Sequence, residues 1–144
     1  MSKFITLLIT AITFISCGAE SENKAQNTDF IGKWKWTGTH GGFADHLHET
    51  PASTETTLQL NLMKNYTFTI FKDGKEVMIG KYELTTIKSI YTGEMEQYIT
   101  CDMSNNPDGR YFVTNGVIKI DEENKLSIDD NNYDGIGSGF ERIE

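Results

Sequence analysis

The chain has 144 residues, of which 21 are acidic and 13 are Lys or Arg, so its formal net charge is −8. This length suits a single domain with a core of its own, and the acidic balance argues against nucleic acid as a partner, because phosphate contacts need clustered basic side chains. The two Pro and thirteen Gly residues are ordinary usage, and the sequence has no internal repeat or low-complexity tract.

Residues 1–16 have the pattern of a secretory signal peptide. A short positive start ends at Lys3, and the apolar run over residues 4–15 is too short to span a bilayer. Ser16 and Cys17 then resemble a bacterial lipobox, in which the cysteine is acylated, for example with palmitate, and becomes the mature N-terminus. The alternatives are an ordinary signal peptide cut near Ala19 and a transmembrane anchor.

Acylation of Cys17 would leave Cys101 without a disulfide partner in the same chain. We interpret Cys101 as a small buried residue of a strand rather than a nucleophile. Residues 17–28 are polar and have almost nothing to bury, which predicts a flexible tether. The folded domain should therefore cover residues 29–144.

The folded part begins with a clear strand signal. Lys33 and Lys35 alternate with Trp34 and Trp36, so an extended chain would present both indoles on one face. The same period of two recurs along the rest of the chain. It predicts further strands over residues 58–62, 66–71, 77–84, 87–91, 95–103, 110–114, 117–120, 125–128 and 140–143.

Turn signals separate these strands. Residues 37–53 contain several breakers and are a predicted loop, while Asp73-Gly74 and Asn115-Gly116 predict tight hairpin turns. Gly80 is interpreted as a bulge. No stretch has a sustained helical period. Eight to ten consecutive hairpin-linked strands predict an all-β fold, an antiparallel up-and-down barrel, because closure removes the exposed edges of such a meander.

The Gly-x-Trp spacing of Gly32 and Trp34, together with Arg142 near the C-terminus, resembles the lipocalin and wider calycin pattern. That resemblance implies an eight-stranded barrel in which Arg142 lies across the Trp34 indole at one end. The chain is also similar to small lipocalin-like lipoproteins of Bacteroidetes-type bacteria, which implies attachment to the cell envelope, with the outer membrane as the expected site, and mostly no assigned activity. The similar segments are residues 32–34, 41–43, 50–53, 60–74 and 80–82.

One segment matches a calcium loop in full. In residues 130–141, Asp130, Asn132 and Asp134 occupy positions one, three and five, and Glu141 occupies position twelve, where a calcium loop places oxygen ligands. The flanking helices of an EF-hand are not predicted. A solvated loop before the last strand is therefore the alternative, and Ca²⁺ is the one cofactor that the pattern suggests.

All three histidines, His40, His46 and His48, lie in the predicted loop 37–53. In an extended chain His46 and His48 would point to the same side, as a zinc or copper site could use. A metal-bound water with Asp45 or Glu49 as base would be the chemistry of a hydrolase. Exposed histidines without a ligand are the alternative, and no P-loop or Cys-x-x-Cys pair accompanies them.

We therefore predict a monomeric, non-catalytic module, attached to the envelope by its lipid, that binds a small apolar or amphipathic molecule in the barrel mouth. Trp36, Phe68 and Tyr82 are the predicted lining residues, although each would equally suit a packed core. The alternative is a structural or protein-interaction lipoprotein with a filled barrel and acidic contact loops, stabilised by Ca²⁺. A third interpretation is the metal hydrolase on the loop histidines.

Overall fold

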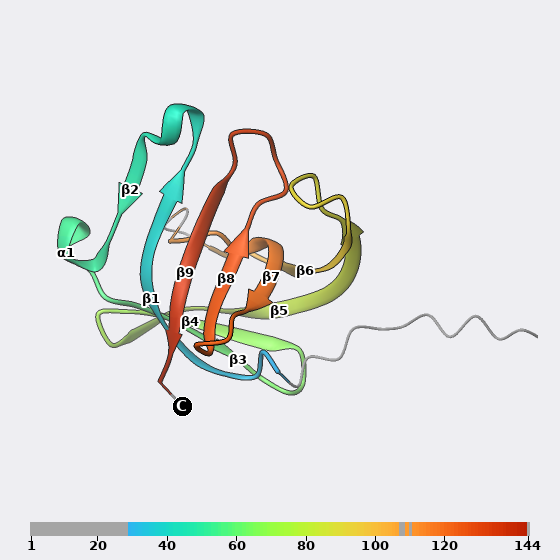
Figure 1. The fold of residues 1–144 in the computed structure, drawn as a ribbon. Helices are drawn as coiled ribbons and strands as arrows, with labels where there is room; N and C mark the ends of the chain where they lie inside the picture. The colour runs from blue at the N-terminus through green and yellow to red at the C-terminus, as the bar shows by residue number, and fades with distance from the viewer. Residues whose placement is uncertain (1–28, 107–108, 110, 144) are drawn as a thin grey trace, which may run out of the picture.

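The computed structural model describes residues 29–106, 109 and 111–143 (Figure 1). Nine strands form one antiparallel sheet that closes on itself, which confirms the predicted all-β barrel. The strands are β1 (Gly32–Gly41), β2 (Leu47–Glu49), β3 (Leu58–Leu62), β4 (Thr67–Lys72), β5 (Lys75–Lys88), β6 (Met95–Cys101), β7 (Asn115–Ile120), β8 (Lys125–Asp129) and β9 (Ile136–Arg142). Two short helical segments, η1 (Phe43–Asp45) and α1 (Pro51–Thr54), flank β2.

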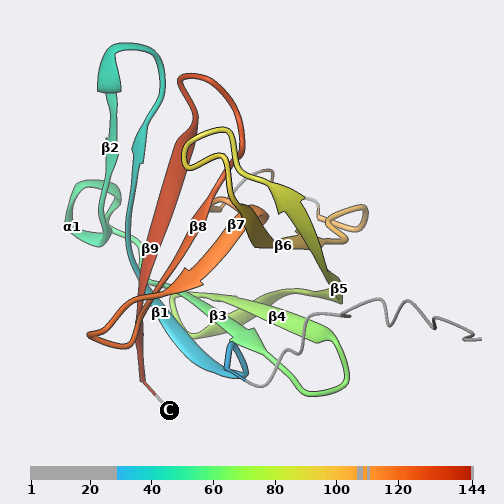
Figure 2. The same cartoon turned by 45° about the vertical axis from the view of Figure 1, so that its right-hand side comes forward.

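Eight strands close the barrel, and β2 is an addition to its rim. From β3 to β9 each strand pairs with the next, and β9 returns to pair with β1 between Trp34–Arg142 and Gly41–Ile136. The other edge of β1 is shared, because β3 pairs with its first half and β2 with its last three residues. Figure 2 shows the resulting barrel from the side. This arrangement is consistent with the calycin-like fold that the resemblance implied.

The first strand follows the predicted alternation. Trp34 and Trp36 are buried, and Lys33 and Lys35 are exposed. The pairing with β9 shifts register between Trp36 and Gly38, and such an irregularity changes which residues face the interior. As a result Thr39 is buried on the inner side.

Two details of the predicted strands are wrong. Residues 77–84 and 87–91 are not separate strands, because β5 runs without a break to Lys88. The bulge lies in β5 at Val77, opposite the Ile70–Phe71 step of β4, and not at Gly80. Gly80 pairs with Phe68, and a Cβ atom at position 80 would lie 2.7 Å from the Phe68 ring. Glycine is needed there because it leaves room for the aromatic side chain.

The predicted hairpin around Asn115-Gly116 is also wrong. Asn115 and Gly116 are the first residues of β7 and pair with β6. The preceding residues do not form a strand, because Tyr111, Phe112 and Val113 turn into the barrel and are buried. The loop predicted over residues 37–53 likewise contains η1, β2 and α1.

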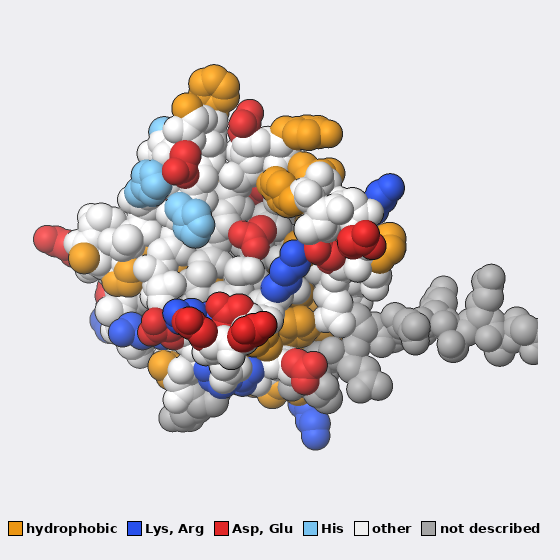
Figure 3. All heavy atoms as spheres, in the orientation of Figure 1, with side chains coloured by type: hydrophobic (Ala, Val, Ile, Leu, Met, Phe, Trp, Pro, Cys, Tyr) orange, Lys and Arg blue, Asp and Glu red, His pale blue; other side chains and the backbone are white. Residues whose placement is uncertain are grey.

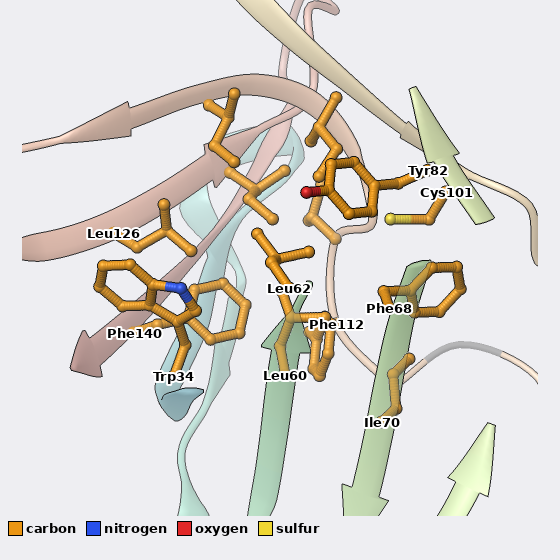
Figure 4. Packing of buried hydrophobic residues seen from close by; sticks show 14 of the residues in the cluster. Trp34, Leu60, Leu62, Phe68, Ile70, Tyr82, Cys101, Phe112, Leu126 and Phe140 are labelled. Atoms are coloured by element: carbon orange, nitrogen blue, oxygen red, sulfur yellow. The ribbon is translucent and has the colours of Figure 1, made fainter. Parts of the chain in front are cut away.

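Buried hydrophobic side chains pack together in the interior of the described barrel. Phe112 packs edge to face on Phe140, with ring centroids 5.1 Å apart, and belongs to the same cluster as Leu60 and Leu62 (Figure 4). The cluster has one buried member or more from every strand except β2, and it also includes Phe30. Burial of this apolar surface is the main stabilising contribution to the fold.

A short chain of hydrogen bonds lies within this apolar core. The Trp36 indole N–H donates to Thr39 Oγ1 (3.0 Å), and Thr39 Oγ1 lies 2.7 Å from Ser138 Oγ. The backbone N–H of Val113 donates to the same Ser138 oxygen at 2.9 Å. Because these groups are buried, each bond satisfies a donor that would otherwise be costly to bury. The bond to Ser138 holds the segment 111–113 in place over the interior.

The opposite end of the barrel is closed by Trp34 and Arg142. The guanidinium carbon of Arg142 lies 4.0 Å from the centroid of the indole, and its Nη1 and Nη2 donate to the carbonyl oxygens of Ile31 and Asp29. The Trp34 indole N–H donates to the Phe30 carbonyl at 2.8 Å. These contacts tie the start of the folded domain to its last strand.

Candidate functional site

Three loops meet at the end of the barrel that lies farthest from Arg142 (Figures 1 and 2). They are residues 42–46 between β1 and β2, residues 89–94 between β5 and β6, and residues 130–135 between β8 and β9. We call this region, together with Met95 at the start of β6, the loop end. It is the part of the described surface where exposed apolar side chains gather.

Hydrogen bonds join the three loops into one surface. The Tyr91 hydroxyl lies 2.6 Å from the Asn132 carbonyl oxygen and 3.1 Å from that of Asp130. Asn131 accepts from the Ile90 N–H at 2.9 Å and donates to the Lys88 carbonyl at 3.2 Å. These bonds fix the 130–135 loop against the 89–94 loop, so the surface is pre-organised.

The third loop is joined through backbone alone. The N–H of Gly42 donates to the carbonyl oxygen of Gly135 at 2.9 Å. Gly41 has a φ of 115°, and a Cβ atom there would lie 2.4 Å from the same Gly135 oxygen. Only glycine combines this φ with so close an approach. The contact therefore depends on the glycines of both loops.

The loop end is apolar and acidic. Of the seven large hydrophobic side chains exposed in the described residues, five belong to it. Its acidic residues are Asp45, Glu94, Asp130 and Asp134, and none of its residues is Lys or Arg. Figure 3 shows hydrophobic and acidic side chains projecting from the upper end of the molecule. The five exposed apolar residues are Phe43 (75%), Ile90 (39%), Tyr91 (57%), Met95 (64%) and Tyr133 (88%).

The electrostatics of this surface act on Tyr91. Desolvation raises the pKa of its phenol above the usual value of 10.0, and the nearby carboxylates of Asp130 and Asp129 raise it further, while the hydrogen bond to Asn132 acts in the opposite direction. The phenol therefore keeps its proton, and the hydrogen bond to the neighbouring loop, over a wide pH range.

A hollow of about 350 Å³ continues from the loop end down the outer wall of the barrel, between His40, Tyr91, Glu96 and Asp129. Glu96 lies 2.8 Å from the ammonium group of Lys119, and the hydrogen bond to Lys119 is the main reason why the pKa of Glu96 lies below its usual value. Since this lysine is already paired, it does not offset the acidity of the loop end.

The residues of the predicted calcium loop lie in two different elements of the structure. Asp130, Asn132 and Asp134 do lie in one loop. Glu141 lies in β9, where it stands opposite Lys35 of β1 and Lys125 of β8 in the backbone register of the sheet. Ile136 and Glu141 are five positions apart in the same strand, a span of about 17 Å, so Glu141 lies far from the 130–135 loop. Asp130 Oδ1 instead accepts the backbone N–H of Ile136 at 3.1 Å. The loop carbonyls bond to Tyr91, as described above.

The loop histidines are brought together differently from the prediction. His46 caps the end of η1, and its Nδ1 lies 2.7 Å from the Phe43 carbonyl oxygen. His48 lies in β2 opposite His40 of β1, and its Nε2 is 3.5 Å from a carboxylate oxygen of Asp45. Within the residues described, no group of three or more His, Cys, Asp or Glu side chains is arranged to hold a metal ion.

The predicted lining residues belong to the packed core. Trp36, Phe68 and Tyr82 are each no more than 2% exposed. The Tyr82 hydroxyl donates to the Met63 carbonyl at 2.9 Å. Trp36 and Tyr82 each line a surface hollow, of about 160 and 450 Å³ respectively, and both belong to the same core cluster as Phe112.

Sequence reasoning missed two features of the site. Tyr91 lies in the loop between β5 and β6, and Asn131 lies 40 positions later, between β8 and β9. No local sequence pattern indicates that these two residues join their loops. Phe112 was assigned to a strand because its neighbours are β-formers. The clustering of Phe43, Tyr91 and Tyr133 had a weak signal, since each is an aromatic residue within a turn-rich segment.

Cys17 and the predicted signal peptide and tether lie outside the described residues. Among the helices that the structure does describe, none has the length and apolar character needed to span a bilayer. Comparison of the chain with models of known families found no match, and comparisons with curated proteins and with solved structures found none either.

Proposed function

We propose that the protein is a non-catalytic binding module of the cell envelope, and that it binds a protein partner at the loop end. The supporting observation is the collection of five exposed apolar side chains at the loop end, whose three loops are held together by hydrogen bonds. Exposed apolar patches rimmed by polar groups are typical of interaction sites. A pre-organised surface loses little conformational entropy on binding, which favours affinity.

The chemistry of the loop end favours a partner segment with basic and apolar side chains. Its four carboxylates and its lack of Lys or Arg attract cations and orient their approach. Its exposed aromatic rings, on Phe43, Tyr91 and Tyr133, offer apolar contact area and faces for cation–π contacts. Tyrosine is also frequent among the residues that dominate binding energy at interfaces.

A lipid on Cys17 would suit this use of the surface. The folded domain starts at the Arg142 end, where Asp29 and Ile31 bond to the guanidinium, whereas the loop end lies at the other end of β9. The twelve residues 17–28 would span about 40 Å when fully extended. An anchor there would leave the loop end facing away from the membrane and accessible.

Binding of a small apolar molecule inside the barrel is the alternative. It would need space that Phe112 and its neighbours now fill, and therefore a displacement of residues 111–113. Their burial and the bond from Val113 to Ser138 oppose such a displacement. We therefore favour the outer surface over the interior.

Site-specific photo-crosslinking in the source cells tests the proposal. A crosslinking amino acid replaces Tyr133 or Phe43 at the loop end. As a matched control it replaces Ile79, which is 59% exposed and lies in the part of β5 that pairs with β4. We expect a discrete protein adduct from position 133 and none from position 79. The adduct should weaken at high salt and in Asp134→Asn, because charge contributes to it.

Two results would overturn the proposal that the loop end is the binding surface. The first is that positions 133 and 79 crosslink with equal yield. The second is that neither position 133 nor position 43 gives an adduct. The anchor is tested separately with Cys17→Ala, which should move the protein from the membrane fraction to the soluble fraction. Retention of Cys17→Ala in the membrane fraction would contradict lipid anchoring and would leave the loop end unaffected.

A further inference from the structure

The outer face of the β1–β2 ribbon carries a pair of histidines. His40 of β1 lies directly opposite His48 of β2 in the antiparallel register, and both side chains are exposed. Residues at directly opposed positions share one face of the sheet, with Cβ atoms about 4.5–5.5 Å apart. Figure 3 shows histidine side chains gathered on this face of the molecule. The two imidazoles are therefore adjacent in space although eight positions apart in sequence.

This spacing suits chelation of one ion by two imidazoles. Both rings are exposed, so each can turn about its side-chain torsions until a ring nitrogen faces the shared position. Short strands hold the two Cα atoms at a fixed separation, which removes much of the entropy loss that two independent histidines would suffer. Imidazole is a good ligand for Zn²⁺, Cu²⁺ and Ni²⁺.

Two neighbours favour a cation at this position. A carboxylate oxygen of Asp45 lies 3.5 Å from His48 Nε2 and adds negative charge beside the pair. His40, His48 and Glu49 also border a hollow of about 250 Å³, which leaves space for an ion and the waters that would complete its coordination. His46, the remaining histidine, lies outside this pair, and its Nδ1 is engaged by the Phe43 carbonyl oxygen at 2.7 Å.

We propose that His40 and His48 form a binding site for a divalent transition-metal ion, with two protein ligands and water in the other positions. Cu²⁺ should bind more tightly than Zn²⁺, following the general order of affinities. The site is on the side wall of the β1–β2 ribbon, and although Asp45 also belongs to the loop end, metal binding by the two histidines does not rest on the loop-end function proposed above. It differs from the predicted pair of His46 and His48, which the register does not bring together.

Calorimetric titration of the purified full chain with Cu²⁺, in the presence of glycine as a weak competing chelator, tests the site. Mutation of an outer-shell partner of a metal ligand already costs about 10- to 100-fold in affinity, and loss of a ligand should cost no less. We therefore expect His40→Ala and His48→Ala each to weaken binding about tenfold or more. Electron paramagnetic resonance of the Cu²⁺ complex should show the signal of coordinated nitrogen, and this signal should be weaker in both variants.

His46→Ala is the matched control, because it removes a histidine of the same ribbon that is not part of the pair. It should bind Cu²⁺ as the unmodified chain does. The proposal is overturned if the unmodified chain does not bind Cu²⁺ or Zn²⁺, if His46→Ala weakens binding as much as His48→Ala, or if neither paired variant weakens it. Since all three positions are exposed, circular dichroism should confirm that every variant remains folded.

Discussion

The guanidinium of Arg142 lies over the indole of Trp34, 4.0 Å from its centroid, and at the same time donates to the carbonyl oxygens of Asp29 and Ile31. One side chain thus joins the last strand, the first strand and the segment that enters the barrel. A planar, permanently charged fork can make these contacts together, whereas an ammonium group cannot.

Arg142→Ala should lower the free energy of unfolding by about 2–4 kcal/mol, because it removes a cation–π contact and three charge-assisted hydrogen bonds, the third being from Nε to Asn124 Oδ1. Arg142→Lys should recover only part of this loss, since lysine keeps the charge but not the fork. Urea denaturation of both variants measures the difference. Full stability in Arg142→Lys would show that charge alone is sufficient.

The burial of Phe112 leads to a second prediction, on the stability of the barrel core. Phe112→Ala removes a ring that is 1% exposed and packs on Phe140, so it should destabilise the fold by about 3–5 kcal/mol. Phe43→Ala is the matched control, because Phe43 is 75% exposed, and it should change stability by less than about 0.5 kcal/mol. Similar values for the two variants would mean that the β6–β7 connection does not fill the interior.

The barrel could be predicted from the sequence because its signal is local. The alternation of Trp34 and Trp36 with lysines, and the later runs of period two, specify strands and their buried faces without any knowledge of partners. The departures have non-local causes. Gly80 reads as a bulge in isolation, but its role is to make room for Phe68 on the neighbouring strand.

The candidate site was less predictable for the same reason. The spacing from Asp130 to Glu141 matches a calcium loop, yet spacing does not reveal that the chain becomes a strand after Gly135. The pairing of His40 with His48 depends on the register of β1 with β2, and β2 itself lies in a predicted loop. At the opposite end of the barrel, the contact of Arg142 with Trp34 follows from a family resemblance rather than from a local pattern.

Calcium should not stabilise the protein. Glu141 lies away from the 130–135 loop, and Asp130 Oδ1 already accepts the N–H of Ile136, so the loop lacks the full set of oxygen ligands. We expect the same melting temperature in millimolar CaCl₂ and in excess chelator. A rise with calcium that disappears in Asp134→Asn would show that the loop rearranges to bind the ion.

The thiol of Cys101 should be unreactive in the folded protein. Burial raises its pKa to about 12, and the thiolate, which is the reactive form, is therefore scarce at neutral pH. In a Cys17→Ser background, where Cys101 is the one remaining cysteine, a thiol reagent should modify it only after denaturation. Rapid modification under native conditions would mean that the core around β6 opens readily.

Tyr91 provides a test in alkaline solution. The pKa of its phenol is raised in the folded state, mainly by desolvation and then by Asp130 and Asp129, relative to the ordinary value of 10.0. The folded state thus holds the proton more tightly than the unfolded state. The stability gained from this is fully present below about pH 10 and is lost as pH rises through the higher pKa of the folded state.

Tyr91→Phe separates this contribution from the other tyrosines. Ultraviolet difference titration of the unmodified chain should contain a component that ionises above the usual range, and Tyr91→Phe should remove that component. The variant should also lose the phenol's link between the 89–94 and 130–135 loops, which amide hydrogen exchange at Gly135 and Ile136 would detect as faster exchange. Unchanged exchange at both positions would mean that Asn131 and the Gly42–Gly135 bond hold the loop end together without the phenol.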